Sequence, residues 1–192
     1  TRPSSFWGCN PRPEHRAPMP ATTYLPLDLL RWDRGPGGDA LVVPVWSDVR
    51  PLRGAAGLLD WRLCGRLSHM LEQGRLSGST GEKLLLVTDR VPWPRVLALG
   101  VGESTAFDDR TFQATADCCL DTLRRIGAKS LAIAFPGRDI DLIRPDRALA
   151  AFLDALARQE QASGPWLDRL TVIDAAASRA PARAQATSPP AA

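Results

Sequence analysis

A glycine-rich segment with an acid and a lysine is the first stretch of the chain that could do chemistry. It reads Gly-Ser-Thr-Gly-Glu-Lys over residues 78–83. A phosphate-binding loop needs its Lys directly after a Gly, and it follows a strand and opens a helix. Here Glu82 separates Gly81 from Lys83, and the apolar residues that follow predict a strand. We therefore predict a loop between a helix and a strand, and no phosphate site.

Two further glycine turns follow apolar runs. Gly100 and Gly102 end one run before a helical pattern, and Pro136-Gly137 follows another. Such turns can present backbone N–H groups to an anion, although a tight turn is the default explanation of a glycine. We assign no cofactor and no cofactor-binding residue. Gly100, Gly102, Pro136 and Gly137 are the candidate loop for a small ligand.

The titratable residues do not form a catalytic set. Asp108 and Asp109 could act as paired carboxylates, but they stand at the start of a predicted helix, where the helix dipole favours negative charge. His69 shares a helical stripe with Arg62 and is predicted to be a solvated surface residue. No group of His, Cys, Asp or Glu has the spacing of a metal site. We predict no catalytic residue, no metal site and no enzyme activity in this chain.

The four cysteines predict no disulfide. They are Cys9, Cys64, Cys118 and Cys119, and none forms a Cys-x-x-Cys pair. Adjacent cysteines rarely bridge because disulfide geometry disfavours it. We expect reduced, mostly buried thiols in a cytoplasmic protein.

Length and charge limit the class of protein. A chain of 192 residues with 44% hydrophobic and 23% charged residues is expected to form one globular domain. We expect no membrane segment, because no apolar run approaches roughly 18 residues, and no signal peptide. The net charge of +3 divides into +2 in residues 1–18, +2 in residues 175–192 and −1 between them. A nucleic-acid partner is not expected, since it needs clustered basic residues.

The elements that would position these residues lie between two segments predicted to be disordered, residues 1–18 and 175–192. The folded domain is predicted over residues 19–174. Strands are expected over residues 24–30, 41–46, 83–88, 95–101, 130–135 and 167–174. Helices are expected from about residue 59 to Gly74, over 108–126 and over 145–161. Pro26 indicates that the first strand lies at a sheet edge.

The alternation of these elements predicts the fold class. Strands that alternate with helices of this length are typical of a three-layer α/β/α domain with a mixed, mostly parallel sheet. The continuous apolar run Leu41–Trp46 is expected of a strand covered on both faces.

Five segments in a fixed order resemble a known family. They are Ala-Leu-Val-Val-Pro-Val at 40–45, Leu-Arg-Gly-Ala at 52–55, Gly-Glu-Lys-Leu-Leu-Leu at 81–86, Val-Leu-Ala-Leu-Gly-Val-Gly at 96–102 and Gly-Ala-Lys-Ser-Leu-Ala-Ile-Ala at 127–134. Over residues 24–174 the chain resembles the N-terminal, non-catalytic domain of the leucyl aminopeptidase family of metallopeptidases. The resemblance implies a macrodomain-like fold. The family's two metal ions are held in a second domain, whose signature we do not find here.

Three functions follow from this resemblance. The first is a non-catalytic module in protein assembly or regulation, because in the family this domain helps subunits form a hexamer and in some members contributes to DNA binding or regulation. The second is a macrodomain-like binder of a nucleotide or ADP-ribose-type ligand near Gly100–Gly102 and Phe135–Gly137. The third is part of a split or truncated aminopeptidase whose catalytic domain lies elsewhere.

The first function requires partners. We expect a protein partner or self-association, and a full-length peptidase of the same family is one candidate. Tryptophan is enriched at interface hot spots. The candidate anchors are Trp7, Trp46, Trp61, Trp93 and Trp166, although Trp46 and Trp61 could equally serve in the core.

Overall fold

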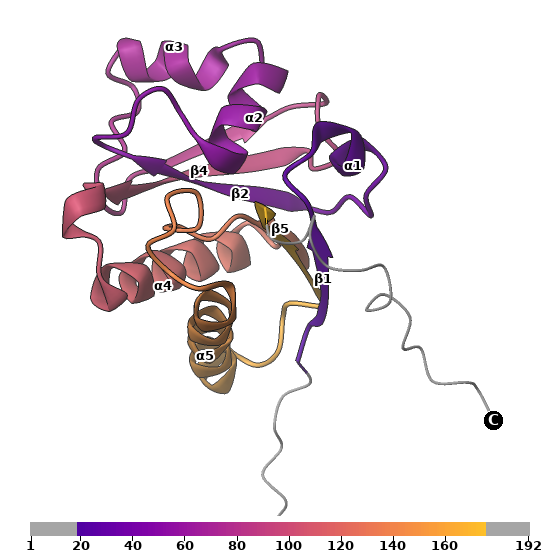
Figure 1. The fold of residues 1–192 in the computed structure, drawn as a ribbon. Helices are drawn as coiled ribbons and strands as arrows, with labels where there is room; N and C mark the ends of the chain where they lie inside the picture. The colour runs from indigo at the N-terminus through magenta and orange to yellow at the C-terminus, as the bar shows by residue number, and fades with distance from the viewer. Residues whose placement is uncertain (1–18, 176–192) are drawn as a thin grey trace, which may run out of the picture.

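The computed structural model describes residues 19–175 (Figure 1). Of the predicted disordered segments, residues 1–18 and 176–192 lie outside the described residues, and Ala175 lies within them. The domain limits of 19–174 therefore stay a prediction.

One six-stranded sheet organises the described chain. Its strands are β1 (Ala21–Leu25), β2 (Ala40–Trp46), β3 (Lys83–Val87), β4 (Arg95–Gly102), β5 (Ser130–Ile133) and β6 (Arg169–Ile173). The order across the sheet is β1-β6-β5-β2-β4-β3. All neighbours are parallel except β3, which runs antiparallel to β4. The mixed, mostly parallel sheet is confirmed.

Helices cover both faces of this sheet. They are α1 (Leu29–Asp33), α2 (Gly54–Arg62), α3 (Arg66–Glu72), α4 (Asp109–Arg125) and α5 (Pro145–Ser163), with a 3-10 turn η1 (Ser104–Ala106). Figure 1 shows α2 and α3 on one side of the sheet and α4 and α5 on the other. The predicted three-layer α/β/α arrangement is therefore confirmed.

Strand β2 is the centre of the core. All seven of its residues are buried, between β4 and β5. Ala40 and Val42 point into the cluster formed with α4 and α5. Leu41 and Val43 point into the cluster formed with α2 and α3. A strand buried on both faces reads as a continuous apolar run, so the sequence pattern and the observed position agree.

The single helix expected between residue 59 and Gly74 is wrong, because the chain forms two helices there. Cys64 and Gly65 have φ angles of 57° and 78°, which end α2. The Asp60 carboxylate then accepts hydrogen bonds from the backbone N–H groups of Leu67 and Ser68, at 2.7 and 3.0 Å. These bonds satisfy the free N–H groups at the start of α3.

The first strand lies earlier than predicted. It covers Ala21–Leu25 and ends before Pro26, where residues 24–30 were expected. Asp28 accepts a hydrogen bond from the Leu30 N–H at 2.8 Å, and this cap starts α1 inside the expected strand. The predicted edge position is confirmed, because β1 pairs only with β6 among the described strands.

Asp39 joins the starts of β2 and β5. Its Oδ2 accepts hydrogen bonds from Lys129 N at 2.8 Å, Ser130 N at 2.8 Å and Ser130 Oγ at 2.9 Å. Partial burial acts to raise the pKa of Asp39, but these hydrogen bonds outweigh it and hold the pKa below its usual value. The charged carboxylate therefore stabilises the contact between the two strands.

We predict that Asp39→Ala lowers the free energy of unfolding by about 1–3 kcal/mol at neutral pH, because three donors lose their acceptor. The folded-state pKa is depressed, so this stabilisation is present above the unfolded pKa of about 3.9 and is lost as pH falls through the folded value. Urea unfolding of both proteins from neutral to acidic pH measures this. The difference between wild type and variant should shrink in acid.

Asp154→Ala is the matched control, because Asp154 is exposed on α5. We expect it to change the unfolding free energy by less than about 0.5 kcal/mol. Equal effects of the two substitutions would contradict a structural role for the Asp39 carboxylate.

Candidate functional site

The carboxyl ends of the parallel strands form the edge of the sheet where a ligand-binding site is expected. In open α/β sheets, ligands bind outside this edge where the strand order reverses. Here β4 lies on one side of β2, and β5 and β6 lie on the other. The candidate residues Gly100 and Gly102 end β4, and Pro136-Gly137 follows β5. The topology therefore brings both halves of the candidate loop to the same edge.

The half formed by Gly100 and Gly102 is packed against the chain itself. A Cβ on Gly100 would lie 2.1 Å from the carbonyl oxygen of Ser79, and one on Gly102 would lie 2.3 Å from Thr80 Oγ1. Gly102 N donates to Gly78 O at 2.8 Å. The two glycine-rich segments singled out in the sequence thus lie side by side, and their contact with each other is enough to require glycine at residue 100.

Glu82 occupies the backbone N–H groups of the segment before β3. Its Oε2 accepts hydrogen bonds from Ser77 N, Ser77 Oγ and Gly78 N, each at 2.8 Å. Burial acts to raise the pKa of Glu82, but these bonds hold it below its usual value. The loop's own carboxylate takes the N–H groups that an anion would need. The segment joins α3 to β3, as predicted.

Two aromatic rings stand between the two halves of the candidate loop. A Cβ on Gly137, which has a φ of +79°, would lie 2.8 Å from Phe107 Cε1. The ring centroids of Phe107 and Trp46 are 5.1 Å apart, and Trp46 pairs with Gly102 in the sheet. The two rings therefore fill the interval between the two halves of the candidate loop.

A buried ion pair closes the next part of the edge. Arg138 Nε donates to Asp174 Oδ2 at 2.7 Å, and Arg138 Nη2 donates to Asp174 Oδ1 at 3.2 Å. Their side chains are 13% and 4% exposed. The hydrogen bond to Asp174 raises the pKa of Arg138. Such a two-bond contact fixes both side chains, so the loop after β5 is held onto the end of β6.

Asp139 lies beside this pair. Its Oδ2 accepts a hydrogen bond from Trp46 Nε1 at 2.9 Å. Burial raises the pKa of Asp139, although the Trp46 hydrogen bond acts to lower it. A Cβ on Gly54, at the start of α2, would lie 2.7 Å from Asp139 Cβ. Asp139 therefore fills the space between α2 and the strand ends.

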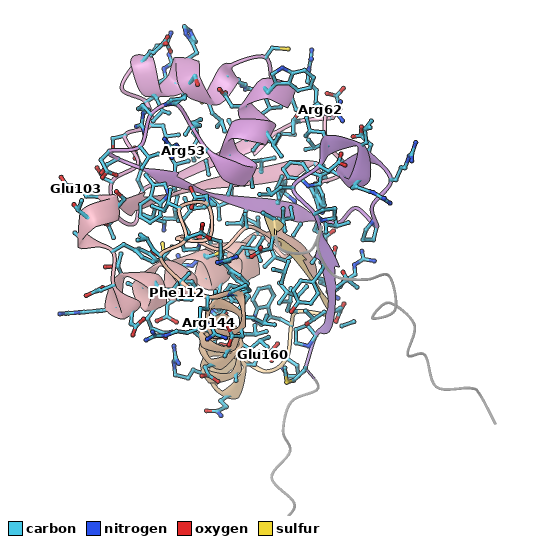
Figure 2. All side chains as sticks on the ribbon, viewed as in Figure 1. Arg53, Arg62, Glu103, Phe112, Arg144 and Glu160 are labelled. Carbon is cyan, nitrogen blue, oxygen red and sulfur yellow. The ribbon has the colours of Figure 1, made fainter. Side chains whose placement is uncertain are left out.

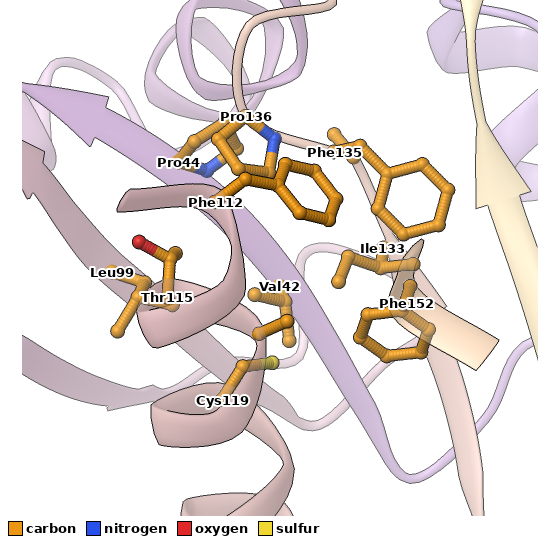
Figure 3. A pocket seen from close by; sticks show the side chains of 12 residues that line it. Val42, Pro44, Leu99, Phe112, Thr115, Cys119, Ile133, Phe135, Pro136 and Phe152 are labelled. Carbon is orange, nitrogen blue, oxygen red and sulfur yellow. The ribbon is translucent and has the colours of Figure 1, made fainter. Parts of the chain in front are cut away.

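The space that remains at this edge is small. The cavity beside Arg53, Arg138 and Asp139 has a volume of about 20 Å³. A second cavity, between α4 and the sheet, has about 10 Å³ and is closed by the rings of Phe112, Phe135 and Phe152 (Figure 3). Each volume fits about one water molecule, whereas small-molecule pockets measure about 300–1,000 Å³. In this conformation the edge is filled by the chain's own side chains.

The other titratable candidates have structural surroundings. Asp108 accepts a hydrogen bond from Thr111 N at 2.7 Å as the N-cap of α4, and Asp109 pairs with Arg147. Their predicted helix-start role is confirmed. His69 is exposed and contacts Gln73, so its predicted surface position is confirmed. Within residues 19–175, no group of three or more His, Cys, Asp or Glu residues could hold a metal ion.

The described cysteines are free. Cys119 is buried, which raises the pKa of its thiol, and Cys118 is half-buried. Cys64 is exposed at the end of α2, so the expectation of mostly buried thiols is wrong for it. Cys9 lies outside the described residues.

The tryptophans divide sharply between core and surface. Trp46 and Trp93 are buried, and Trp93 packs edge-on against Trp32, so the expectation that Trp93 is a surface anchor is wrong. Trp166 is half-buried, and Trp7 lies outside the described residues. Trp61 is 73% exposed on α2.

Trp61 borders an open hollow. The lining includes Pro51, Leu52, Cys64 and Arg90. The next residue, Arg62, pairs with Asp33 and ties α2 to α1 (Figure 2). Helix α2 is therefore fixed in place while its Trp side chain faces solvent.

Comparisons with known proteins agree with this fold. The model of the cytosol aminopeptidase family, N-terminal domain, matches residues 42–164. A probable cytosol aminopeptidase of Pseudomonas syringae pv. tomato is 31% identical over 122 residues, which are 63% of this chain and 25% of the relative. The chain thus spans about a quarter of that relative's length.

Two solved structures show the same fold. A tomato leucine aminopeptidase mutant aligns with a TM-score of 0.58 and 16% identity, over 85% of this chain and 34% of that one. A Trypanosoma brucei macrodomain in complex with ADP aligns with a TM-score of 0.60 and 16% identity, over 83% of this chain and 73% of that one. No helix within residues 19–175 is long and apolar enough to cross a membrane.

We predict that Gly100→Ala lowers the free energy of unfolding by about 1–3 kcal/mol, because the new methyl group would overlap the Ser79 carbonyl. The comparison is Gly81→Ala, where the methyl group meets nothing within 4 Å and only the positive φ is strained. Urea unfolding measures both. If Gly100→Ala left stability unchanged, packing would not explain this glycine.

Proposed function

The chain belongs to the cytosol aminopeptidase family through that family's N-terminal domain, and from this we propose that it is a non-catalytic module that acts through protein contacts in assembly or regulation. The observation that carries the proposal is the extent of the match. It covers residues 42–164 with an N-terminal domain, and the chain spans about a quarter of the matched relative.

The chemistry of the described residues supports a role in contacts. Residues 19–175 contain no cluster suited to a metal ion. The edge of the sheet where a ligand would bind is filled by Arg138, Asp139 and Trp46. By contrast, Trp61 lies on the surface, and a large exposed aromatic side chain can bury much area in a partner at little entropic cost.

The partner we propose is a full-length cytosol aminopeptidase of the same cell. The matched N-terminal domain is part of such an enzyme in the Pseudomonas syringae relative, whose name places it in the cytosol. We extend that location to this chain as part of the proposal. A split enzyme, in which this chain adds its domain to a catalytic domain on another chain, is the alternative closest to this one.

We predict that the pure chain releases no p-nitroaniline from leucine p-nitroanilide above the metal blank, with Mn²⁺ or Zn²⁺ present. The reason is that the described residues contain no group of three or more His, Cys, Asp or Glu that could hold a metal ion. A spectrophotometric assay measures this. Release that co-elutes with the chain and disappears with a chelator would contradict the proposal that the module is non-catalytic.

We predict that Trp61→Ala weakens binding to the purified full-length peptidase at least about tenfold, since hot-spot tryptophans contribute 2 kcal/mol or more. Biolayer interferometry with the full 192-residue chain measures the dissociation constant. Leu30→Ala is the matched control, because Leu30 is 67% exposed on α1. Equal dissociation constants for wild type and Trp61→Ala would show that Trp61 does not take part in the contact. If the wild-type chain did not bind the peptidase at all, the proposal of this partner would be wrong.

The macrodomain likeness leaves a second ligand class to test. ADP-ribose that bound the folded chain would raise its melting temperature in proportion to the logarithm of ligand concentration. We expect no rise, because the strand-end cavity holds about one water molecule. A saturable rise that Gly137→Ala abolished would replace protein contact with nucleotide binding as the proposed function.

A further inference from the structure

The sheet ends in a strand whose outer edge no described residue covers. That strand is β3, last in the order after β4. Thr88 N donates to Pro94 O at 3.0 Å, and Gly100 N donates to Glu82 O at 2.8 Å. In an antiparallel ladder the bonded residues alternate, so the even-numbered residues of β3 bond to β4. The N–H and C=O groups of Lys83, Leu85 and Val87 therefore point away from the sheet.

The side chains of the same three residues lie on an uncovered face. Leu84 and Leu86 point to the other face, into the cluster of α2 and α3. Leu85 is 43% exposed and Val87 is 73% exposed. Natural edge strands are usually protected by charges, bulges or covering elements. Here only the lysine at residue 83 gives such protection.

Two opposite charges flank this apolar pair. Lys83 comes before it and Asp89 comes after it, and both are exposed. Lys83 is the first residue of β3, and Asp89 lies two residues past its last residue, in the bend that follows. Neither makes an ion pair with another described residue. The edge thus carries a positive end, an apolar middle and a negative end.

We propose that β3 pairs antiparallel with β3 of a second copy, centred on Leu85, so that two sheets become one continuous sheet. This inference rests on the proposed function, because it names a surface and a partner for an assembly module. In this register Lys83 lies opposite Val87 of the second copy, and Leu85 lies opposite Leu85. Asp89 of the second copy follows Val87 by two residues, beyond the end of β3, and so lies near Lys83, within reach of its long side chain.

The self-complementarity of the edge favours a second copy over other occupants. A two-fold axis brings the same surface of both partners together, so the outward groups of β3 must be complementary to the same groups read in the opposite direction. The backbone groups of the odd-numbered residues point outward on both strands and can pair. Opposite charges then meet at both ends of the paired strands. The paired strands are only five residues long, so we expect a weak, concentration-dependent dimer.

The test is sedimentation velocity of the full 192-residue chain over a concentration series. We expect the wild type to shift from monomer to dimer. Val87→Lys places two lysines opposite each other and should raise the dissociation constant at least about tenfold. Leu30→Lys is the matched control, at an exposed apolar residue on α1 outside β3, and should leave the dissociation constant unchanged. A wild type that stays monomeric throughout the series would overturn the inference.

A charge exchange tests the register. Lys83→Asp and Asp89→Lys should each raise the dissociation constant, because each brings like charges together at both ends. The double variant restores opposite charges and should recover most of the wild-type affinity. Additive losses in the double variant would overturn the antiparallel pairing. Far-ultraviolet circular dichroism of each variant confirms folding, which surface positions should preserve.

The outcomes separate this inference from the proposed function. A monomeric chain that binds the full-length peptidase would overturn the β3 dimer and leave the protein-contact function supported. If the double charge variant recovered its affinity but the chain cleaved leucine p-nitroanilide, the β3 dimer would be supported. The proposal of a non-catalytic function would then be overturned.

Discussion

The burial of β2 on both faces is the constraint on which the rest of the structure depends. Seven consecutive buried residues need apolar cover above and below. Helices α2 and α3 supply it on one side, and α4 and α5 supply it on the other (Figure 1). That cover extends outward from β2 and thins toward the edge of the sheet. Beyond β4, on the α4 side, it leaves Leu85 and Val87 exposed, so a strongly covered centre has an open margin.

The same packing closes the place where a fold of this kind can hold a ligand. The Arg138–Asp174 ion pair fastens the loop after β5 to the end of β6, and Asp139 bonds to Trp46 at the end of β2. A buried pair of this kind is weak evidence for stability as such. It does fix the positions of the groups that occupy the edge. With the interior of the site filled, the remaining chemically distinctive groups are on the surface, at Trp61 and along β3.

Much of the fold could be predicted from local patterns. The apolar run of β2 predicts its burial, and Asp108 and Pro145 mark the starts of α4 and α5 because capping and a fixed proline φ act locally. The break between α2 and α3 could not be predicted. It depends on a left-handed Cys64 and on Asp60 capping a helix that begins six residues later, and the helical stripe of leucines continues across both.

The candidate site shows a second limit of sequence reasoning. Gly100 and Gly102 were singled out as a candidate ligand loop or a tight turn, but the sequence does not say that Ser79 and Thr80 pack against them. The position of Glu82 between Gly81 and Lys83 argued against a phosphate-binding loop. In the structure its carboxylate accepts a hydrogen bond from Gly78 N, in the same segment. The exposure of Trp61 and of β3 depends on the order of strands and on how far each helix reaches, which no local pattern encodes.

We propose that this domain functions through its open sheet edge and its surface. Amide hydrogen exchange of the full chain at low and high protein concentration, measured residue by residue along β3, tests this proposal. We expect the N–H groups of Lys83, Leu85 and Val87 to exchange more slowly at high concentration, while those of Leu84 and Leu86, already bonded to β4, do not change. Concentration-independent exchange at the three odd-numbered residues would contradict it.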